Sequence, residues 1–570
     1  MRKTAIGTIL LVAILIITST VVMPGTLTAA QGEELSFDLI APGVLGYWIR
    51  VCEIFKRSCE EIGIKINVKA LEVGAWVDAM MTTHDFDIAM CGMLMEPTPS
   101  YLPLLFHSKY AEGGFNIAGV NNSELDALLD ESQVTIDHDE LKNIIWQIQE
   151  IIAENIYSIP IFTEDVVFAY SNKFTGILGI PGDGAVNIWT YINMRRTDVE
   201  GGEIKIGMLG DIKTNNPFLR TLALEGYIDR MIFEPLVVFD LNLTVVPWLA
   251  KSWEVSEDGL VWTFYLRDNV TWHDGEPFTA EDVVFTIDTV LKYKPPTWYS
   301  YFEMIDRAEA VDNYTVKVYM KQPYSWTLTT FAMFEILPKH AWEGVQWNTT
   351  DPPMIGTGPF KWVKWVKNEY IELEKNPNYW QAGKPHLDRV LWTVYETGSA
   401  HVLALRAGEV DLMYRYIPLE SIKTLIEDPN IIVGVSPGLN FRYFIPNLRR
   451  APFDDINLRR ALAHAVDKET IVNAIMLGYA EPIDSFVPQA WGEWNNPEVP
   501  KYEYNLTKAN EILDEAGYLD VDNDGVRELP GTPAPKPIPI WVWIAVAVVV
   551  TAVISGGAAY IIVKRKAKPT

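Results

Sequence analysis

The feature that most constrains this chain is an apolar run near its C-terminus. Residues 540–563 form a stretch of 24 residues without a single charge. As a helix that rises ~1.5 Å per residue, this stretch would reach about 36 Å, enough to cross a hydrocarbon core of ~30 Å. Four basic side chains follow within residues 564–570, which predicts a cytoplasmic tail. The sequence therefore predicts one transmembrane helix close to the C-terminus.

The N-terminus has the pattern of a secretory signal peptide. Two basic residues precede an apolar run over residues 6–22, and small residues follow it. We expect a signal peptide at 1–30, with an uncleaved N-terminal anchor as the alternative. A proline-rich spacer at 531–539 precedes the predicted membrane helix. Residues 33–530 are thus predicted to lie outside the cell, on a single-pass protein of the cell membrane.

Charge and cysteine content exclude several classes of protein. The 47 Lys and Arg against 74 Asp and Glu give a formal net charge of −27. A nucleic-acid-binding face is cationic, so we predict no nucleic-acid partner. Three cysteines are too few for a disulfide scaffold or a cysteine-based metal module. Cys52 and Cys59 lie ~10 Å apart along a predicted helix, too far for a disulfide, and we expect them and Cys91 to be buried free thiols.

Six Asn-x-Ser/Thr sequons are compatible with an exterior surface that carries glycans. They begin at Asn121, Asn242, Asn269, Asn313, Asn348 and Asn505. Several such triplets arise by chance, so the sequons support an exterior location without establishing it.

Strand and helix periodicities alternate through the exterior part, which predicts an α/β fold. A strand over 35–40, a helix over 48–62 and a strand over 64–71 form a β-α-β unit that favours parallel pairing. The polar, glycine-bearing stretch 196–202 is typical of a linker, so two lobes are favoured over one. One strong helix is expected over 457–477.

No catalytic constellation is present in the sequence. It contains no Gly-x-x-x-x-Gly-Lys-Ser/Thr phosphate loop, no His-Glu-x-x-His zinc motif and no Gly-x-Ser-x-Gly nucleophile motif. The eight histidines are scattered, without the spacing of metal ligands. We therefore predict that the chain is not an enzyme and that it holds no cofactor.

The segment 203–530 carries a succession of specific motifs. The longest extends from Leu249 to Val284 and ends in Trp272-His-Asp-Gly-Glu-Pro-Phe-Thr-Ala-Glu-Asp-Val-Val284. It is followed in order by Gly356-Thr-Gly-Pro-Phe360, Asn376-Pro-Asn-Tyr-Trp380, Ala407-Gly-Glu-Val-Asp411, Pro452-Phe-Asp-Asp455 and Arg459-Arg-Ala-Leu-Ala-His-Ala-Val-Asp467. This succession closely resembles the family 5 extracellular solute-binding proteins, the oligopeptide- and dipeptide-type receptors of ABC importers. The resemblance implies a two-lobed periplasmic-binding-protein-like fold of class II type that closes around a ligand by a hinge motion.

Residues 33–195 resemble the C-terminal third of the same family. The matching stretches are Gly63-Ile-Lys-Ile-Asn-Val68, Asp85-Phe-Asp-Ile-Ala-Met-Cys-Gly92, Ser123-Glu-Leu-Asp-Ala-Leu-Leu129 and Ile159-Pro-Ile-Phe162. In ordinary members this third follows the part that is 203–530 here, so we infer a circular permutation joined at 196–202. The alternative is that 33–195 completes a neighbouring chain by swapping. In the intramolecular case, Glu34 and Glu528 should lie close together.

The resemblance places the ligand between the lobes, beside the loop that follows a predicted strand at 86–91. In peptide-binding members this loop carries an Asp before Pro that pairs with the peptide α-amine. Here Thr98 precedes Pro99, so that carboxylate is missing, and Glu96 is the candidate to replace it. Stacking of sugars on aromatic rings is a second option, although most aromatic residues of such a fold are core. The candidate ligand-binding residues are Met93, Glu96, Thr98, Tyr101, Phe441, Tyr443, Trp491 and Trp494.

An acidic turn resembles the first half of a calcium loop. It contains Asp520, Asp522, Asp524 and Glu528. The twelfth position is Gly531, where an EF-hand requires a bidentate Glu. A solvated acidic turn is therefore favoured over a calcium site, and no metal is predicted.

Together these features predict a membrane-anchored receptor that captures peptides, or oligosaccharides, and delivers them to separate ABC permease and ATPase subunits. The alternatives are a tethered sensory or adhesion module that reuses the fold and, third, an exposed hydrolase.

Overall fold

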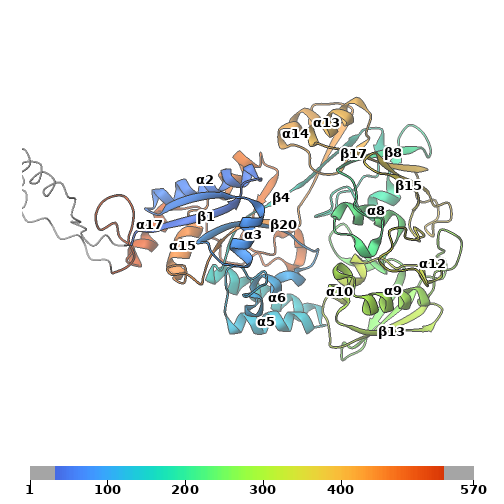
Figure 1. The fold of residues 1–570 in the computed structure, drawn as a ribbon, viewed down its shortest axis with the longest axis horizontal. Coiled ribbons are helices and arrows are strands. Elements are labelled where there is room, and N and C mark those ends of the chain that lie inside the picture. The colour runs from blue at the N-terminus through green and yellow to red at the C-terminus, as the bar shows by residue number, and fades with distance from the viewer. Residues whose placement is uncertain (1–32, 532–570) are drawn as a thin grey trace, which may run out of the picture.

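The computed structural model describes residues 33–531. They form two lobes, which lie side by side along the long axis of the molecule (Figure 1). Within 33–531, no helix is both long enough and apolar enough to span a membrane. The predicted signal peptide, most of the predicted spacer, the predicted membrane helix at 540–563 and the predicted tail all lie outside the described residues.

The first lobe is built on a six-stranded sheet in the order β2-β1-β3-β20-β4-β21. The three strands at one side are parallel, and β20 runs antiparallel to both of its neighbours. The predicted β-α-β unit is confirmed in β1, α2 and β2, because β1 and β2 pair in parallel register. The strands are β1 (Ser36–Pro42), β2 (Lys65–Leu71), β3 (Ile88–Leu94), β4 (Ile159–Glu164), β20 (Asn440–Pro446) and β21 (Ala480–Pro482).

Helices from both ends of the described chain cover this sheet. Figure 1 shows the N-terminal α2 and the C-terminal α15 and α17 in the same lobe, where α15 packs against α17. They share one apolar core, in which Phe55 of α2 stacks on Phe444 of β20 with ring centroids 4.4 Å apart. The helices of this lobe are α2 (Gly46–Glu61), α3 (Val73–Met81), α4 (Leu102–Phe106), α5 (Ser123–Val134), α6 (His138–Asn155), α15 (Ile456–His464), α16 (Lys468–Thr470) and α17 (Leu506–Glu515).

The second lobe contains a seven-stranded sheet in the order β15-β16-β17-β8-β18-β5-β19 and a four-stranded sheet in the order β11-β12-β14-β13. Fully buried tryptophans such as Trp272, Trp298 and Trp392 fill the core beneath them, since large rings bury much apolar surface. The strands of the larger sheet are β5 (Val166–Ser171), β8 (Glu203–Leu209), β15 (Phe360–Val366), β16 (Tyr370–Lys375), β17 (Arg389–Tyr395), β18 (Leu412–Met413) and β19 (Ile431–Ser436). Those of the smaller sheet are β11 (Ala250–Val255), β12 (Val261–Leu266), β13 (Ile305–Asp312) and β14 (Thr315–Met320).

Short hairpins and helices complete the second lobe. Two-stranded pairs are formed by β9 (Val237–Phe239) with β10 (Val245–Pro247), and by β6 (Phe174–Thr175) with β7 (Arg195–Arg196). The helices are α7 (Ile188–Asn193), α8 (Ala223–Ile232), α9 (Ala280–Tyr293), α10 (Pro296–Phe302), α11 (Thr327–Met333), α12 (Lys339–Trp342), α13 (Gly398–Ala407) and α14 (Leu419–Ile426).

Two chain crossings join the larger sheets of the lobes, one from β4 to β5 and one from β19 to β20. They are tied together at Asn440, whose side chain accepts from the Glu164 backbone N–H at 2.9 Å and donates to the Glu164 carbonyl at 2.8 Å. A Cβ on Gly438 would lie 1.9 Å from that carbonyl, so the close approach requires glycine. The crossings are therefore a paired connection, positioned to act as a hinge.

The ends of the described region meet in the first lobe. Glu34 and Glu528 form an antiparallel bridge, and the Leu35 N–H donates to the Arg527 carbonyl at 2.7 Å. The expectation that Glu34 and Glu528 lie close together is confirmed.

Two other expectations have different outcomes. Cys52, Cys59 and Cys91 are buried and free, as predicted. The single helix predicted over 457–477 is wrong, because α15 ends at His464 and a new helical segment starts after Asp467. The Asp467 side chain accepts from the Thr470 N–H at 2.9 Å, which caps this second segment.

Candidate functional site

A cavity of about 560 Å³ lies between the two lobes. The loop after β3 contributes its first-lobe wall at Leu94–Pro97, and Leu439 lies at the hinge. The second lobe contributes Trp189, Arg220 and Tyr301, among others. Small-molecule pockets in proteins typically measure about 300–1,000 Å³, so this cavity has the size of a ligand site.

Glu96 is the acidic side chain on the first-lobe wall. It is half-buried, and its carboxylate accepts from the Ser100 hydroxyl at 2.8 Å and from the Tyr301 hydroxyl. Tyr301 belongs to α10, so this contact bridges the lobes. Burial raises the pKa of Glu96, while the hydrogen bonds from Tyr301 and Ser100 oppose that rise. Within 33–531, no Lys, Arg or His forms an ion pair with Glu96.

The second-lobe wall carries charges that are already paired. Nη1 of Arg220 contacts both carboxylate oxygens of the buried Glu335, at 2.8 and 2.7 Å, and lies 3.7 Å from Asp229. Burial raises the pKa of Asp229, with Arg220 opposing the rise and Glu335 adding to it. Near it, Arg230 and Asp183 form an ion pair at 2.7 Å. These side chains present neutralised pairs to the cavity rather than free charges.

The two walls therefore differ in what they offer a ligand. A half-buried carboxylate that is held only by hydroxyl groups is best stabilised by a positive charge, because neutral donors compensate its desolvation incompletely. Glu96 fits this description, and it is one of the residues that line the cavity. The arrangement suits a ligand with one cationic group and an otherwise largely apolar surface.

Glu96 is the one sequence-predicted candidate that lines the cavity. Five others belong to an apolar core behind the loop, where Tyr101 and Trp491 pack edge to face at 6.1 Å. The Trp491 indole N–H donates to the Glu96 carbonyl at 2.9 Å, so this residue positions the loop. Direct ligand contact by the remaining candidates stays a prediction. The five in the core are Tyr101, Phe441, Tyr443, Trp491 and Trp494. Met93 packs against this core, and Thr98 is buried beside Thr329.

Sequence reasoning missed the second-lobe wall. Arg220, Tyr301 and Glu335 lie outside the recognised motifs, on three separate elements or loops. Their proximity arises from tertiary packing, and Arg220 also lies over the rings of Trp298 and Phe334 at 5.6 and 5.4 Å. No local pattern in the sequence links these positions.

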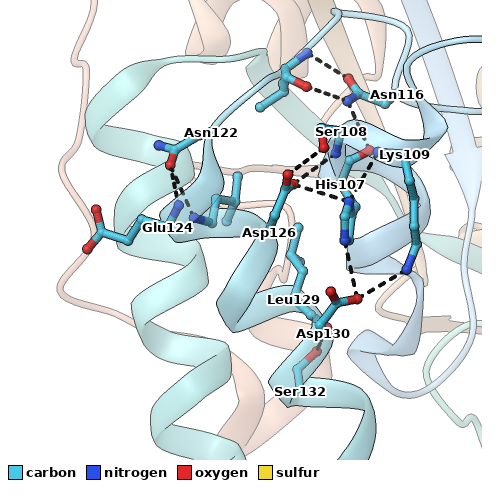
Figure 2. A network of polar contacts seen from close by, with 12 residues as sticks. His107, Ser108, Lys109, Asn116, Asn122, Glu124, Asp126, Leu129, Asp130 and Ser132 are labelled. Atoms are coloured by element: carbon cyan, nitrogen blue, oxygen red, sulfur yellow. Dashed lines mark hydrogen bonds and ion pairs between the residues drawn. The ribbon is translucent and has the colours of Figure 1, made fainter.

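His107 lies in a separate polar network that includes Asp126 and Asp130 (Figure 2). Its Nδ1 is 3.2 Å from Asp126 and its Nε2 is 3.2 Å from Asp130, which also pairs with Lys109 at 3.1 Å. Burial acts to raise the pKa of Asp130, but hydrogen bonds from Lys109 and His107 lower it overall. The two carboxylates contact different nitrogens of one ring, so the network fastens α5 to the loop before it.

The acidic turn brings ligand oxygens of Asp520, Asp522 and Glu528 within 4.8 Å of one another. Backbone donors already use these carboxylates. The Asp524 N–H contacts both Asp520 and Asp522 at 3.2 Å, and the Val521 N–H contacts Glu528 at 2.9 Å. This pattern is typical of an acidic turn whose carboxylates accept hydrogen bonds from the turn's own backbone. Calcium binding there stays a prediction.

Comparisons with known proteins find relatives of one kind. The profile of the bacterial extracellular solute-binding proteins, family 5, middle part, matches residues 244–547, more than half of the chain. The oligopeptide-binding protein AppA of Bacillus subtilis is 32% identical over 349 residues, which cover 58% of this chain and 62% of the relative. The glutathione-binding protein GsiB of Pectobacterium atrosepticum is 30% identical over 312 residues, 53% of this chain and 59% of the relative.

The match to each of these relatives is partial. The chain spans about 60% of the length of the two curated relatives. Among solved structures, that of AppA from Bacillus subtilis in complex with a nonapeptide aligns with a TM-score of 0.41 at 27% identity, over 59% of this chain and 67% of that one.

Proposed function

The chain belongs to the family 5 extracellular solute-binding proteins, and on that premise we propose that it is the peptide receptor of an ABC-type importer. It binds its ligand between the lobes without chemistry and delivers it to separate permease and ATPase subunits. The observation that carries this proposal is Glu96, a cavity carboxylate with hydroxyl donors but no cationic partner among the described residues.

The α-amino group of a peptide is the cation that Glu96 receives. It offers a compact positive charge with donors for a carboxylate, and a charge-assisted hydrogen bond of this kind contributes ~1.5–3 kcal/mol. Apolar side chains such as Trp189, Val238 and Phe239 line the cavity elsewhere. They suit the body of a peptide better than they suit an oligosaccharide, whose hydroxyl groups would need many polar partners.

A binding panel tests this function directly. The full chain in detergent is mixed with equimolar sets of short peptides and oligosaccharides, and complexes are identified by native mass spectrometry. Peptides should be retained and oligosaccharides should not. Retention of oligosaccharides alone would contradict the proposal.

We further propose that residues 540–563 anchor this receptor in the cell membrane, with 531–539 as spacer and 564–570 in the cytoplasm. The uncharged length and the basic residues that follow it support this topology. Protease treatment of intact cells should remove the large domain and leave a short C-terminal fragment in the membrane. Release of the whole chain from membranes by carbonate would contradict the anchor.

We also propose that 33–195 and 203–530 are halves of one family fold stored in the opposite order and joined at 196–202. The bridge between Glu34 and Glu528 supports this proposal. So does the sharing of strands: β5 lies in the second-lobe sheet, and β20 and β21 lie in the first-lobe sheet. A gene that joins 530 to 33 and opens the chain within 196–202 should give a protein of similar unfolding free energy and affinity. Aggregation of that protein, while the natural order folds, would contradict the permutation.

A further inference from the structure

The six sequons occupy a distinctive set of positions in the folded chain. All 28 asparagines lie within the described residues, and half of them, 14, are exposed. Every one of the six sequon asparagines is exposed, whereas only 8 of the other 22 are. If sequons were distributed over the asparagines at random, about half of the six would be buried or half-buried. The sequon asparagines are therefore exposed more often than the other asparagines of the chain.

The local geometry of these positions is also uniform. None of the six asparagines lies inside a helix or a strand. Asn313 lies at the tip of the hairpin between β13 and β14, and Asn242 lies in the turn between β9 and β10. Hairpin tips expose the side-chain amide on several sides, and loop tips tolerate added groups well.

Two further sequons, at Asn348 and Asn505, show how the fold presents the asparagine amide. Asn348 is exposed between Trp347 and Thr349, whose carbonyls both accept from the buried Asn216 side chain at 2.9 Å. These two hydrogen bonds fix the loop that carries Asn348. Asn505 uses only its Oδ1, as the N-cap that accepts from Lys508 at 2.9 Å. Its Nδ2, the atom that a glycan would occupy, has no partner among the hydrogen bonds of the described residues.

We propose that these sequons are N-glycosylation sites, so that the exterior domain carries glycans on both lobes. In the transfer, Nδ2 of the asparagine forms a bond to the anomeric carbon of an oligosaccharide linked to a lipid phosphate. The bond from that carbon to the phosphate oxygen breaks, the lipid phosphate leaves with the electron pair, and Nδ2 gives up one proton. The inference depends on the exterior location of the domain and not on peptide binding.

Glycopeptide mass spectrometry on the full chain, purified from membranes of the cells that make it, tests the proposal. Peptides that contain sequon asparagines should carry an added oligosaccharide mass, first of all at Asn313 and Asn242. Asn368 is the matched control, because it is exposed at the tip of the β15–β16 hairpin but is followed by Glu369 and Tyr370. Unmodified peptides at all six sequons, or equal modification at Asn368, would overturn the proposal.

Two variants made in the same cells sharpen this test. Asn313→Gln should lower the intact mass by one glycan without changing the melting temperature, because no hydrogen bond of the Asn313 side chain contributes to the described structure. Tyr370→Thr creates the triplet Asn-Glu-Thr at the control hairpin, and a glycan should appear at Asn368. A folded Tyr370→Thr protein without that glycan, in cells that modify Asn313, would overturn the assignment of hairpin tips as acceptor sites.

Discussion

The two walls of the cavity differ in how the charge of a carboxylate is compensated. On the second lobe, Glu335 is fully buried and contacts Arg220 through both oxygens. On the first lobe, Glu96 has two hydroxyl donors and no cation within the described chain. Glu335 is thus neutralised within the fold, whereas a cation on a ligand could neutralise Glu96. This contrast is the reason why we propose Glu96, and not Glu335, as the acid that binds the ligand.

The largest expected effect comes from breaking the internal pair. Arg220→Met removes the cation and leaves Glu335 and Asp229 without compensation, and loss of one partner of a buried pair costs ~3–5 kcal/mol. Urea unfolding at neutral pH should therefore show a free energy of unfolding lower by that amount. Arg389→Met is the matched control, since Arg389 is substantially exposed and pairs with Glu203 and Glu372 at the surface. It should cost no more than ~1 kcal/mol, and equal losses in both variants would contradict the internal role of Arg220.

A third carboxylate, Glu234, sharpens the comparison. Within residues 33–531 it too has no cationic partner, but it is fully buried and accepts from Trp248 and Tyr379 at 2.7 Å and from Trp380 at 3.1 Å. Burial raises the pKa of Glu234 to about 7, although these donors oppose the rise. Enclosure by neutral donors thus raises the pKa of this acid to near neutral pH, and Glu234 is not among the residues that line the cavity between the lobes.

Thermodynamic linkage gives the sign of the effect of Glu234 on the pH dependence of the unfolding free energy. Between the unfolded pKa and the folded pKa of Glu234, the folded chain keeps a proton that the unfolded chain has lost. The free energy of unfolding should fall by about 3 kcal/mol as the pH rises from 4.5 to about 7. Glu234→Gln should remove this part of the slope, as measured by urea unfolding at a series of pH values. An unchanged slope in the variant would assign the titration to another group.

Much of this architecture could be predicted from local sequence. The β1-α2-β2 unit follows from periodicity, and the motif residues form turns and caps. His273, for example, links two motif segments, because its ring contacts the Gly358 carbonyl at 3.0 Å and the Gly356 N–H at 3.1 Å. The cavity was harder to predict. Glu96 could be proposed from the sequence as the carboxylate that replaces the one missing at Thr98, but Arg220 and Tyr301 come together only through packing of distant elements.

The same limit applies to the aromatic candidates and to the long helix. Phe441 and Trp491 lie in an apolar core behind the loop after β3, and nothing in the sequence distinguishes a ring that faces a ligand from a ring in the core below it. The long helix over 457–477 has continuous helical periodicity, but Asp467 can cap a new helix and thereby interrupts the old one. Tertiary context decided both cases.

The smallest expected effect concerns the hydroxyl groups on Glu96. Tyr301→Phe removes one donor from the carboxylate, which should raise the pKa of Glu96 further and orient its side chain less well. The affinity for free-amine peptides should fall by ~0.5–1.5 kcal/mol, or two- to tenfold, in isothermal titration. Tyr319→Phe removes a hydroxyl that contacts the exposed Glu309 at 3.0 Å and should leave affinity unchanged. A similar loss of affinity in both variants would show that the Tyr301 hydroxyl has no specific role in ligand binding.

The most direct test is a double-mutant cycle between Glu96 and the ligand amine. The tightest-binding peptide from the panel is titrated, with a free and with an acetylated N-terminus, into the natural protein and into Glu96→Gln. The amine and the carboxylate should be coupled by ~1.5–3 kcal/mol, so acetylation weakens binding at least tenfold in the natural protein and little in the variant. Equal losses on acetylation in both proteins would show that Glu96 does not receive the amine.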